Sequence, residues 1–470
     1  MPKRRTEGWS ALGSAAACVL TACSSQPAPP TSVVAQADTA DLNTEDLRVL
    51  PGTFSTLLRD NIVATDARNL EGFGVPDARI PHPDTYWPYL LKAEDGGIEE
   101  ADGIDFRWQG PSVNSPLEKY MALVAPNDAT TRASAKQWEH DHHGPGLGER
   151  LNREVQNWEG HCPGWTGASM SNAPIVHPVF VQPDRNNVFA PCTEAEERNG
   201  ILGCMRLEIG DINALQAEVY VDGVQPMVGR GCFTKNPTSD EFDRIRRNPN
   251  LVKGENGRGC RGLNPGTLLS LLAGRLKAAD PQPFAINAQR PELTEQIWNQ
   301  PVYRYIVHQY QEVNMARAIA LVAKNKNGTP APTEYVWNLA AKGFVFVDFS
   351  LLWVKEHAPT RVFISGKETT RKHRINAIIE LDKDIAADPG ARDTARIVGG
   401  EYLTDDDVAS RNDGVTFGPN RLTVPTFVWV SSDAGPEALS VEEASDPKRQ
   451  RHNPFVKPSV VKRLTALGQR

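Results

Sequence analysis

The stretch that decides the fold class lies towards the C-terminus and reads Phe344-Val345-Phe346-Val347-Asp348-Phe349-Ser350-Leu351-Leu352-Trp353-Val354. It is rich in the aromatic and β-branched side chains that favour strands. Residues 376–382 and 396–403 have a similar composition, and loops separate the three stretches. The C-terminal half is therefore predicted to be rich in antiparallel strands.

Helices are predicted upstream of these strands. Asp211 precedes an amphipathic stretch, residues 212–219, and is predicted to be its N-cap. Asn264-Pro265-Gly266 opens a second predicted helix over residues 267–277, whose leucines are frequent enough for burial on most sides. Another helix is predicted near residues 47–60. Helices that precede strands in the sequence favour an α+β class.

The N-terminus has the features of a bacterial lipoprotein signal. A basic head, Met1-Pro2-Lys3-Arg4-Arg5, precedes an apolar segment that is too short for a permanent membrane helix. Small residues then lead to Cys23, which cleavage would leave as the lipid-bearing residue. An ordinary secretory signal is the alternative. We expect a protein of the bacterial cell envelope, attached to the membrane through lipid on its periplasmic or surface face.

The chain of 470 residues has room for a large core and is predicted to have five parts. These are a signal peptide (1–22), a tether (23–39), an N-terminal covering region (40–152), a core domain (153–435) and a C-terminal tail (436–470). The formal net charge is −7, with acidic and basic residues interspersed. This pattern has no nucleic-acid footprint, so no nucleic-acid partner is expected.

The seven cysteines separate into classes. Cys18 leaves with the signal and Cys23 takes lipid, so five remain in an oxidising compartment. Four of the five lie downstream in a loop-rich region and are the disulfide candidates, most simply Cys192 with Cys204 and Cys232 with Cys260. Four cysteines allow three connectivities, and all three stay open. In this reading Cys162 is the odd thiol.

Cys162 is the second residue of the stretch His161-Cys162-Pro163-Gly164-Trp165-Thr166-Gly167-Ala168-Ser169, which is typical of a thiol at the start of a helix with Trp165 behind it. Helix N-terminal N–H groups favour the thiolate, which is the form that attacks a carbonyl. The stretch therefore predicts acyl-transfer chemistry. The alternative is a disulfide-bonded or simply buried cysteine, and the odd number of cysteines argues against a disulfide.

Three stretches of the chain resemble the transglutaminase elicitor family, which is described in oomycete plant pathogens and present in bacteria. They are the Cys162 motif with residues 211–215 after it, residues 378–382 with 397–403, and Ile297-Trp298-Asn299-Gln300-Pro301-Val302. The last is the most specific, because it is close to the peptide, centred on Val-Trp-Asn-Gln-Pro-Val, by which plants recognise the oomycete enzymes. The resemblance covers about residues 158–429.

The resemblance implies a protein-glutamine γ-glutamyltransferase with a papain-like core, in which Cys162 forms a thioester with a substrate glutamine and an amine resolves it. Calcium dependence is implied as well, and the expected partners are a glutamine-bearing protein or peptide and an amine donor. Trp165 and Trp298 are the expected binding residues, with Trp298 in a core or cleft wall.

The chain departs from the family at the catalytic base. The resemblance implies a histidine within the second predicted helix and an aspartate further on, where this chain has Leu269 and Asn287. Asn287 is suited to orienting an imidazole, whereas Leu269 carries no proton. The candidate replacement base is His308, and His177 is a weaker one. Whether the protein is an enzyme is therefore left open, with two alternatives to the transferase: a catalytically inactive envelope binding or scaffold lipoprotein, and a cysteine peptidase or amidase.

No metal site is predicted from the sequence. The cysteines lack the paired spacing of zinc ligands. His140-Asp141-His142-His143 is interpreted as a solvated loop, because adjacent histidines rarely converge on one ion without a distant fourth ligand. The acidic run at residues 404–407 lacks the interleaved spacing of an EF-hand loop and is interpreted as a solvated turn.

Overall fold

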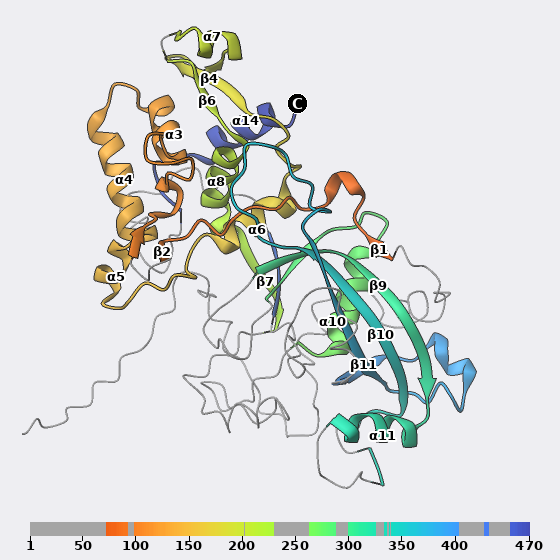
Figure 1. The fold of residues 1–470 in the computed structure, drawn as a ribbon. Helices are drawn as coiled ribbons and strands as arrows, with labels where there is room; N and C mark the ends of the chain where they lie inside the picture. Colours follow the sequence, from red (N-terminus) through yellow and green to blue (C-terminus); the bar gives the residue numbers. More distant parts are fainter. Residues whose placement is uncertain are drawn as a thin grey trace, which may run out of the picture.

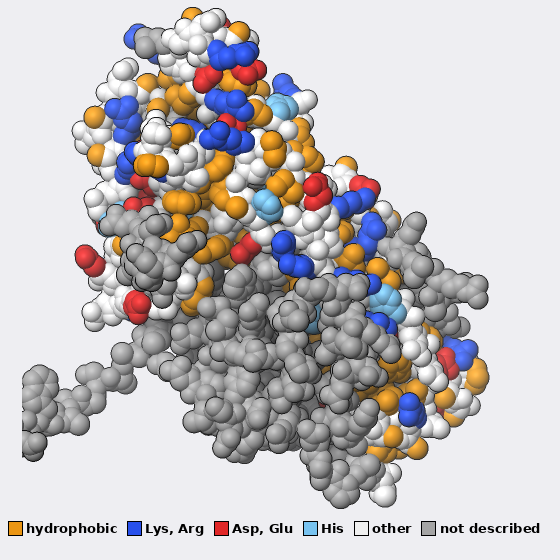
Figure 2. Space-filling model, viewed as in Figure 1, with side chains coloured by type: hydrophobic (Ala, Val, Ile, Leu, Met, Phe, Trp, Pro, Cys, Tyr) orange, Lys and Arg blue, Asp and Glu red, His pale blue; other side chains and the backbone are white. Residues whose placement is uncertain are grey.

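The computed structural model describes residues 72–92, 98–201, 203–229, 263–287, 299–325, 333–335, 338, 340–403, 427–431 and 452–470. In these residues an antiparallel sheet and a group of helices form the two main parts of an α+β fold (Figure 1). Among the described helices, none combines the length and the apolar character required to cross a bilayer. On the face drawn in Figure 2, acidic and basic side chains are interspersed.

The main sheet has eight strands in the order β12-β11-β10-β9-β8-β13-β7, with β1 paired to β9. The strands are β1 (Phe73–Gly74), β7 (Val224–Gly229), β8 (Phe284–Asn287), β9 (Asn299–Val313), β10 (Gly343–Val354), β11 (Thr370–Leu381), β12 (Ile397–Leu403) and β13 (Phe427–Ser431). The three strands predicted from composition are confirmed as β10, the second half of β11, and β12. All pairings are antiparallel, so the predicted class of sheet is confirmed as well.

The sheet buries alternate residues against α10 (Pro265–Leu276). Val345, Val347 and Phe349 of β10 lie in one core with leucines of α10, as the period of two in a strand requires. Asn264 caps α10, its Oδ1 accepting from the Gly266 N–H at 2.8 Å, and the helix predicted there is confirmed. Gly266 allows the close approach, because a Cβ there would lie 2.5 Å from the Gly399 carbonyl oxygen of β12.

Most of the helices outside the main sheet, together with a small three-stranded sheet, form a second core. The helices are α3 (Pro116–Val124), α4 (Ala129–His143), α5 (Gly146–Leu151), α6 (Cys162–Ser171), α7 (Glu194–Arg198), α8 (Ile209–Tyr220) and α14 (Pro458–Gly468), and α11 (Met315–Asn325) packs beside the main sheet. The small sheets are β2 (Leu90–Lys92) with β3 (Ile98–Glu100), and β4 (Val179–Asp184) with β5 (Val188–Pro191) and β6 (Met205–Leu207). Short 3-10 turns lie at η2 (Asp77–Arg79), η3 (Gly103–Asp105), η4 (Val221–Gly223) and η6 (Pro389–Asp393).

Helix α6 lies between the two parts, contacting α8 on one side and the start of β9 on the other (Figure 1). The contact with α8 is close because residue 164 is glycine, where a Cβ would lie only 1.9 Å from the Ala217 carbonyl oxygen. Residues 452–470, expected to belong to a C-terminal tail, instead contain α14, which packs on α8. Gln216 Nε2 of α8 donates to Thr465 Oγ1 of α14 at 2.8 Å.

Two local expectations were wrong. Helix α8 begins at Ile209 with Glu208 as N-cap, so Asp211 is the third helical residue and not the cap. Its fully buried carboxylate accepts from Lys119 Nζ at 2.6 Å and Trp108 Nε1 at 2.9 Å, partners that sequence spacing does not reveal. Residues 140–143 are the last turn of α4 rather than a loop. The helix predicted near residues 47–60 and the run at 404–407 lie outside the described residues.

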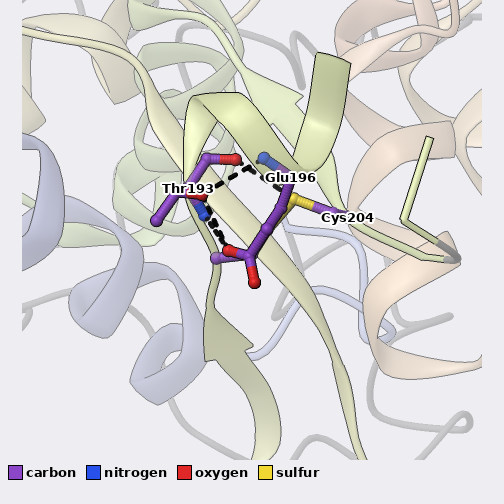
Figure 3. Close-up of a disulfide and its surroundings, with 4 residues drawn as sticks. Thr193, Glu196 and Cys204 are labelled. Carbon is purple, nitrogen blue, oxygen red and sulfur yellow. Dashed lines mark hydrogen bonds between the residues drawn. A yellow bond between two sulfur atoms is a disulfide. The ribbon is translucent and has the colours of Figure 1, made fainter. Parts of the chain in front are cut away.

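The predicted disulfide between Cys192 and Cys204 is confirmed, with 6.1 Å between the two Cα atoms. It closes the turn around α7, whose N-cap Thr193 accepts from the Glu196 N–H (Figure 3). Cys232, Cys260 and the lipidation candidate Cys23 lie outside the described residues. Cys162 keeps its thiol, as the odd-cysteine argument predicted.

Candidate functional site

The thiol of Cys162 lies at the first residue of α6, and only 3% of the residue is exposed. Two polar side chains approach the sulfur from the sheet half of the molecule. Asn299 Nδ2 lies 3.6 Å from Sγ, and Glu356 Oε1 lies 3.8 Å from it. The N-terminus of a helix, an amide donor and a carboxyl group therefore meet at one nucleophilic atom.

The Asn299 side chain is held in a fixed orientation. Its Oδ1 accepts from Trp429 Nε1 at 2.8 Å, which turns Nδ2 towards the sulfur. Its backbone oxygen accepts from Thr166 Oγ1 of α6 at 3.4 Å. Because Asn299 is the first residue of β9, these contacts join α6, the helix of Cys162, to the start of this long strand. An amide donor in this place stabilises a thiolate or an oxyanion that forms beside it.

Glu356 follows β10, and its carboxyl group is desolvated. Desolvation raises the pKa of Glu356 to about 7, although the hydrogen bond from Cys162 opposes the shift. A carboxyl group with such a pKa exchanges protons readily near neutral pH, as a general base must. The described residues of the Cys162 site thus include a proton carrier that is not a histidine.

The covering region closes the site with a segment around Asp84. Burial raises the pKa of Asp84 to about 7 although Trp87 Nε1 donates to its carboxyl group at 2.9 Å, and the charge of Glu356 adds to the shift. The backbone oxygen of Asp84 accepts from the His357 N–H at 2.9 Å. Burial, Glu356 and Cys162 together raise the pKa of Tyr86. Two segments far apart in sequence therefore meet beside the buried thiol.

The predicted site residues lie in different places. Asn287 is buried and pairs with Asn299 across β8 and β9. It therefore lies on the strand next to Asn299, the residue that contacts the Cys162 sulfur. His308 lies nine positions further along β9, roughly 30 Å at the rise of a strand, and bonds Ser350 Oγ at 2.7 Å. The structure therefore does not bring His308 to Cys162. His177 is exposed and bonds the neighbouring Pro178 oxygen.

The other predictions concern apolar residues. Leu269 is buried among the leucines of α10 in the core of the sheet. Trp165 is buried within α6, and Trp298 lies outside the described residues, so the binding roles of both tryptophans stay predictions. Sequence reasoning missed Asn299 as a site residue, although it stands inside the specific Trp-Asn-Gln-Pro stretch. It also missed Glu356, for which the local sequence carries no signal.

A second polar group lies directly behind the nucleophile. Glu139, His143, His161 and Glu218 are all buried, and one ligand atom from each lies within 4.8 Å of the others. They come from α4, from the residue before α6, and from α8. A donor set with two imidazole nitrogens and two carboxylates does not suit Ca²⁺, which takes six to eight oxygen ligands.

Comparisons with known proteins agree with this architecture. The sequence profile of the family described as Transglutaminase elicitor matches residues 152–424. A solved structure, the GP42 transglutaminase from Phytophthora sojae, has the same fold with a TM-score of 0.53 and 17% sequence identity, over 90% of this chain and 99% of that one. Among curated proteins, the comparison finds no match.

Proposed function

Because the chain belongs to the transglutaminase elicitor family, we propose that it is a cysteine acyltransferase that acts on protein-bound glutamine through Cys162. The observation that carries the proposal is the thiol at the N-terminus of α6, with Asn299 Nδ2 and the Glu356 carboxyl group beside the sulfur. Glu356 takes the proton-carrier role that the resemblance assigned to a histidine.

In the first half-reaction the sulfur attacks the carboxamide carbon of a substrate glutamine. The thiol proton passes to the Glu356 carboxylate as the S–C bond forms, and Asn299 Nδ2 donates to the oxyanion. The proton on Glu356 then passes to the departing nitrogen, and ammonia leaves. The product is a thioester between Cys162 and the glutamyl group, with Glu356 again ionised.

In the second half-reaction an amine attacks the thioester carbon. Glu356 accepts a proton from the attacking amine and returns it to the departing sulfur, so an isopeptide amide forms and the thiol is restored. If water attacks instead, the same steps convert glutamine to glutamate. Burial of the thiol under the segment around Asp84 favours the amine by restricting water.

The test is amine incorporation by the full mature chain. A glutamine-bearing protein is incubated with a fluorescent primary amine, and labelled protein and released ammonia are measured together. We expect both products in equal amounts from the wild type and neither from Cys162→Ala. Ammonia without amine incorporation would identify a hydrolase. Neither product, with slow alkylation of Cys162 by iodoacetamide, would identify a binding protein.

We also propose that the protein is attached to the bacterial cell envelope through lipid on Cys23. The basic head, short apolar segment and small residues before this cysteine support the proposal. The mature N-terminal peptide is expected to carry acyl chains by mass spectrometry. A Cys23→Ser chain that still fractionates with the membrane would contradict lipid attachment at this residue.

A further inference from the structure

We propose that Glu139, His143, His161 and Glu218 form a closed binding site for one divalent transition-metal ion of the zinc class. The inference rests on this cluster alone and is independent of the proposed acyl transfer. The sequence pattern alone predicted no metal. That expectation assumed that the histidines of residues 140–143 lack distant co-ligands, and the fold supplies two, His161 and Glu218.

Of five distances between the four ligand atoms, three match a tetrahedral ion, one is shorter and one is longer. Ligands at about 2.0–2.1 Å from zinc lie about 3.4 Å from one another. His143 Nδ1 is 3.1 Å from His161 Nε2, 3.3 Å from Glu139 Oε1 and 3.4 Å from Glu218 Oε2. His161 Nε2 is 2.5 Å from Glu218 Oε2 and 4.0 Å from Glu139 Oε1. Two nitrogens and two oxygens therefore surround one point.

The contacts inside the cluster do not form a satisfied hydrogen-bond network. Within the described residues Glu218 Oε2 accepts no hydrogen bond of good geometry, although two imidazole nitrogens lie close to it. The facing nitrogens of His143 and His161 cannot both carry a proton at 3.1 Å. With one of them unprotonated, two buried carboxylates face at most one positive charge. A divalent ion with two neutral imidazoles removes this imbalance.

The outer contacts orient the ligands as in a metal site. The Nδ1 atom of His161 lies 3.4 Å from the Trp87 carbonyl oxygen, so it carries the proton and leaves Nε2 for an ion. Glu139 Oε1 accepts from the Ile104 N–H at 3.1 Å, and its Oε2 accepts from Asn453 Nδ2 at 3.0 Å. The Asn453 N–H donates to Glu218 Oε1. Both carboxylates are thus fixed by donors outside the cluster.

Aromatic side chains make the surroundings dry. The ring of Tyr89 stacks on His143 with 5.1 Å between centroids and meets the His161 ring edge-on at 5.2 Å. Trp138 meets His143 edge-on at 5.0 Å. Gly103 closes the remaining side, because a Cβ there would lie 2.5 Å from Glu139 Oε1. Four protein ligands and a water-poor shell are typical of a structural site rather than a catalytic one.

The ion would join three elements around the nucleophile. Glu139 and His143 are one turn apart on α4, Glu218 is on α8, and His161 directly precedes Cys162. Binding would therefore fix the covering helix α4 and the start of α6 relative to α8. Its role is to position the first turn of α6, since His161 directs its ring to the cluster and not to the sulfur.

The test begins with metal content. The full mature chain is produced in zinc-supplemented medium and purified with a tag that binds no metal. Its metal content is measured by elemental mass spectrometry. We expect one zinc ion per chain in the wild type, loss of zinc in His143→Ala and Glu218→Gln, and retention in His140→Ala. The control is matched because His140 is on the same helix but bonds Asp102, outside the cluster.

A second measurement decides the matter if the variants fail to fold. Wild-type protein is dialysed against a chelator, followed by thermal unfolding, and refilled with Zn²⁺ or Co²⁺. We expect a lower Tm without metal, recovery with Zn²⁺, and the intense visible bands of four-coordinate Co²⁺ without a sulfur charge-transfer band. If the folded wild type takes up neither ion, the proposed metal site is wrong. A sulfur charge-transfer band would show that Cys162 is a ligand and would contradict the proposed ligand set.

Discussion

Single residues set the chemistry of the thiol. Glu356 and Asn299 reach Cys162 from the same end of the antiparallel strands β9 and β10, Asn299 with an amide at the start of β9 and Glu356 with a carboxyl group just after β10. The position where the family resemblance placed a histidine is Leu269, deep in the core of the sheet. Residue-by-residue transfer of a family motif therefore fails at this position, although Cys162 was correctly predicted to keep a reduced thiol.

Replacing Glu356 with glutamine is expected to remove the general base. We expect kcat/KM for amine incorporation to fall by about 10²–10⁴-fold, the usual contribution of a positioned proton carrier. The wild-type rate should fall as the pH drops through about 7, where Glu356 becomes protonated. This acidic limb of the pH–rate profile should be absent in the variant. Glu368→Gln, an exposed change in the same connection between β10 and β11, is the control. If Glu356→Gln keeps the same acidic limb in its pH–rate profile, another residue is the general base.

The same substitution is expected to stabilise the protein at high pH. The pKa of Glu356 rises from 4.5 to about 7 on folding, so its contribution to stability is complete below about 4.5 and is lost as the pH rises through 7. The loss is at most roughly 3 kcal/mol, and less where solvent screens the charge. In denaturant unfolding at pH 8, Glu356→Gln should therefore have a higher free energy of unfolding than the wild type. At pH 4 the two free energies should be equal. A variant less stable at pH 8 would contradict the shift.

At the scale of elements, the sequence predicted those that depend on local patterns. β10, β12 and α10 were found because aromatic and β-branched composition and an Asn-Pro-Gly start are properties of short segments. The start of α8 was missed because the burial of Asp211 depends on Lys119 and Trp108, about a hundred positions away. Glu356 and the four-residue cluster were missed for the same reason, since tertiary contacts alone bring their members together.

The packing of α6 on α8 is expected to tolerate no side chain at residue 164. A Cβ in Gly164→Ala would lie 1.9 Å from the Ala217 carbonyl oxygen, and backbone atoms move only at a cost. We expect the free energy of unfolding to fall by about 3 kcal/mol, the upper end for overpacking. Gly274→Ala is the matched control: it is exposed on α10 with open space around it, and should add about 1 kcal/mol. Equal denaturation midpoints for both variants would refute this account of the helix contact.

At the scale of the whole molecule, the disulfide-bonded end lies apart from the Cys162 site. The disulfide, α7 and the sheet β4-β5-β6 lie at one end of the molecule, away from the long strands that carry Asn299 (Figure 1). The α+β class and the antiparallel sheet could be predicted from the order and composition of segments. The joining of the C-terminal segment to the helical core could not, because its partners on α8 lie more than two hundred residues upstream.

Removal of the disulfide is expected to affect stability but not the nucleophile. The bridge spans 12 residues, and a loop of that size contributes about 2–3 kcal/mol. The double variant Cys192→Ser, Cys204→Ser should therefore unfold at lower denaturant concentration, while the rate of Cys162 alkylation stays at the wild-type value. A slowed alkylation rate would show that this end of the molecule is coupled to the thiol.

Asn453 gives the molecule an order of assembly in time. It bonds Glu218 through its backbone and Glu139 through its side chain, and it follows Glu218 by 235 positions in the chain. Asn453 is therefore synthesised long after both carboxylates, which until then lack the hydrogen bonds that it donates. The surroundings of Cys162 are therefore completed only once Asn453 has been synthesised, so a product truncated before this residue has Cys162 without its full support.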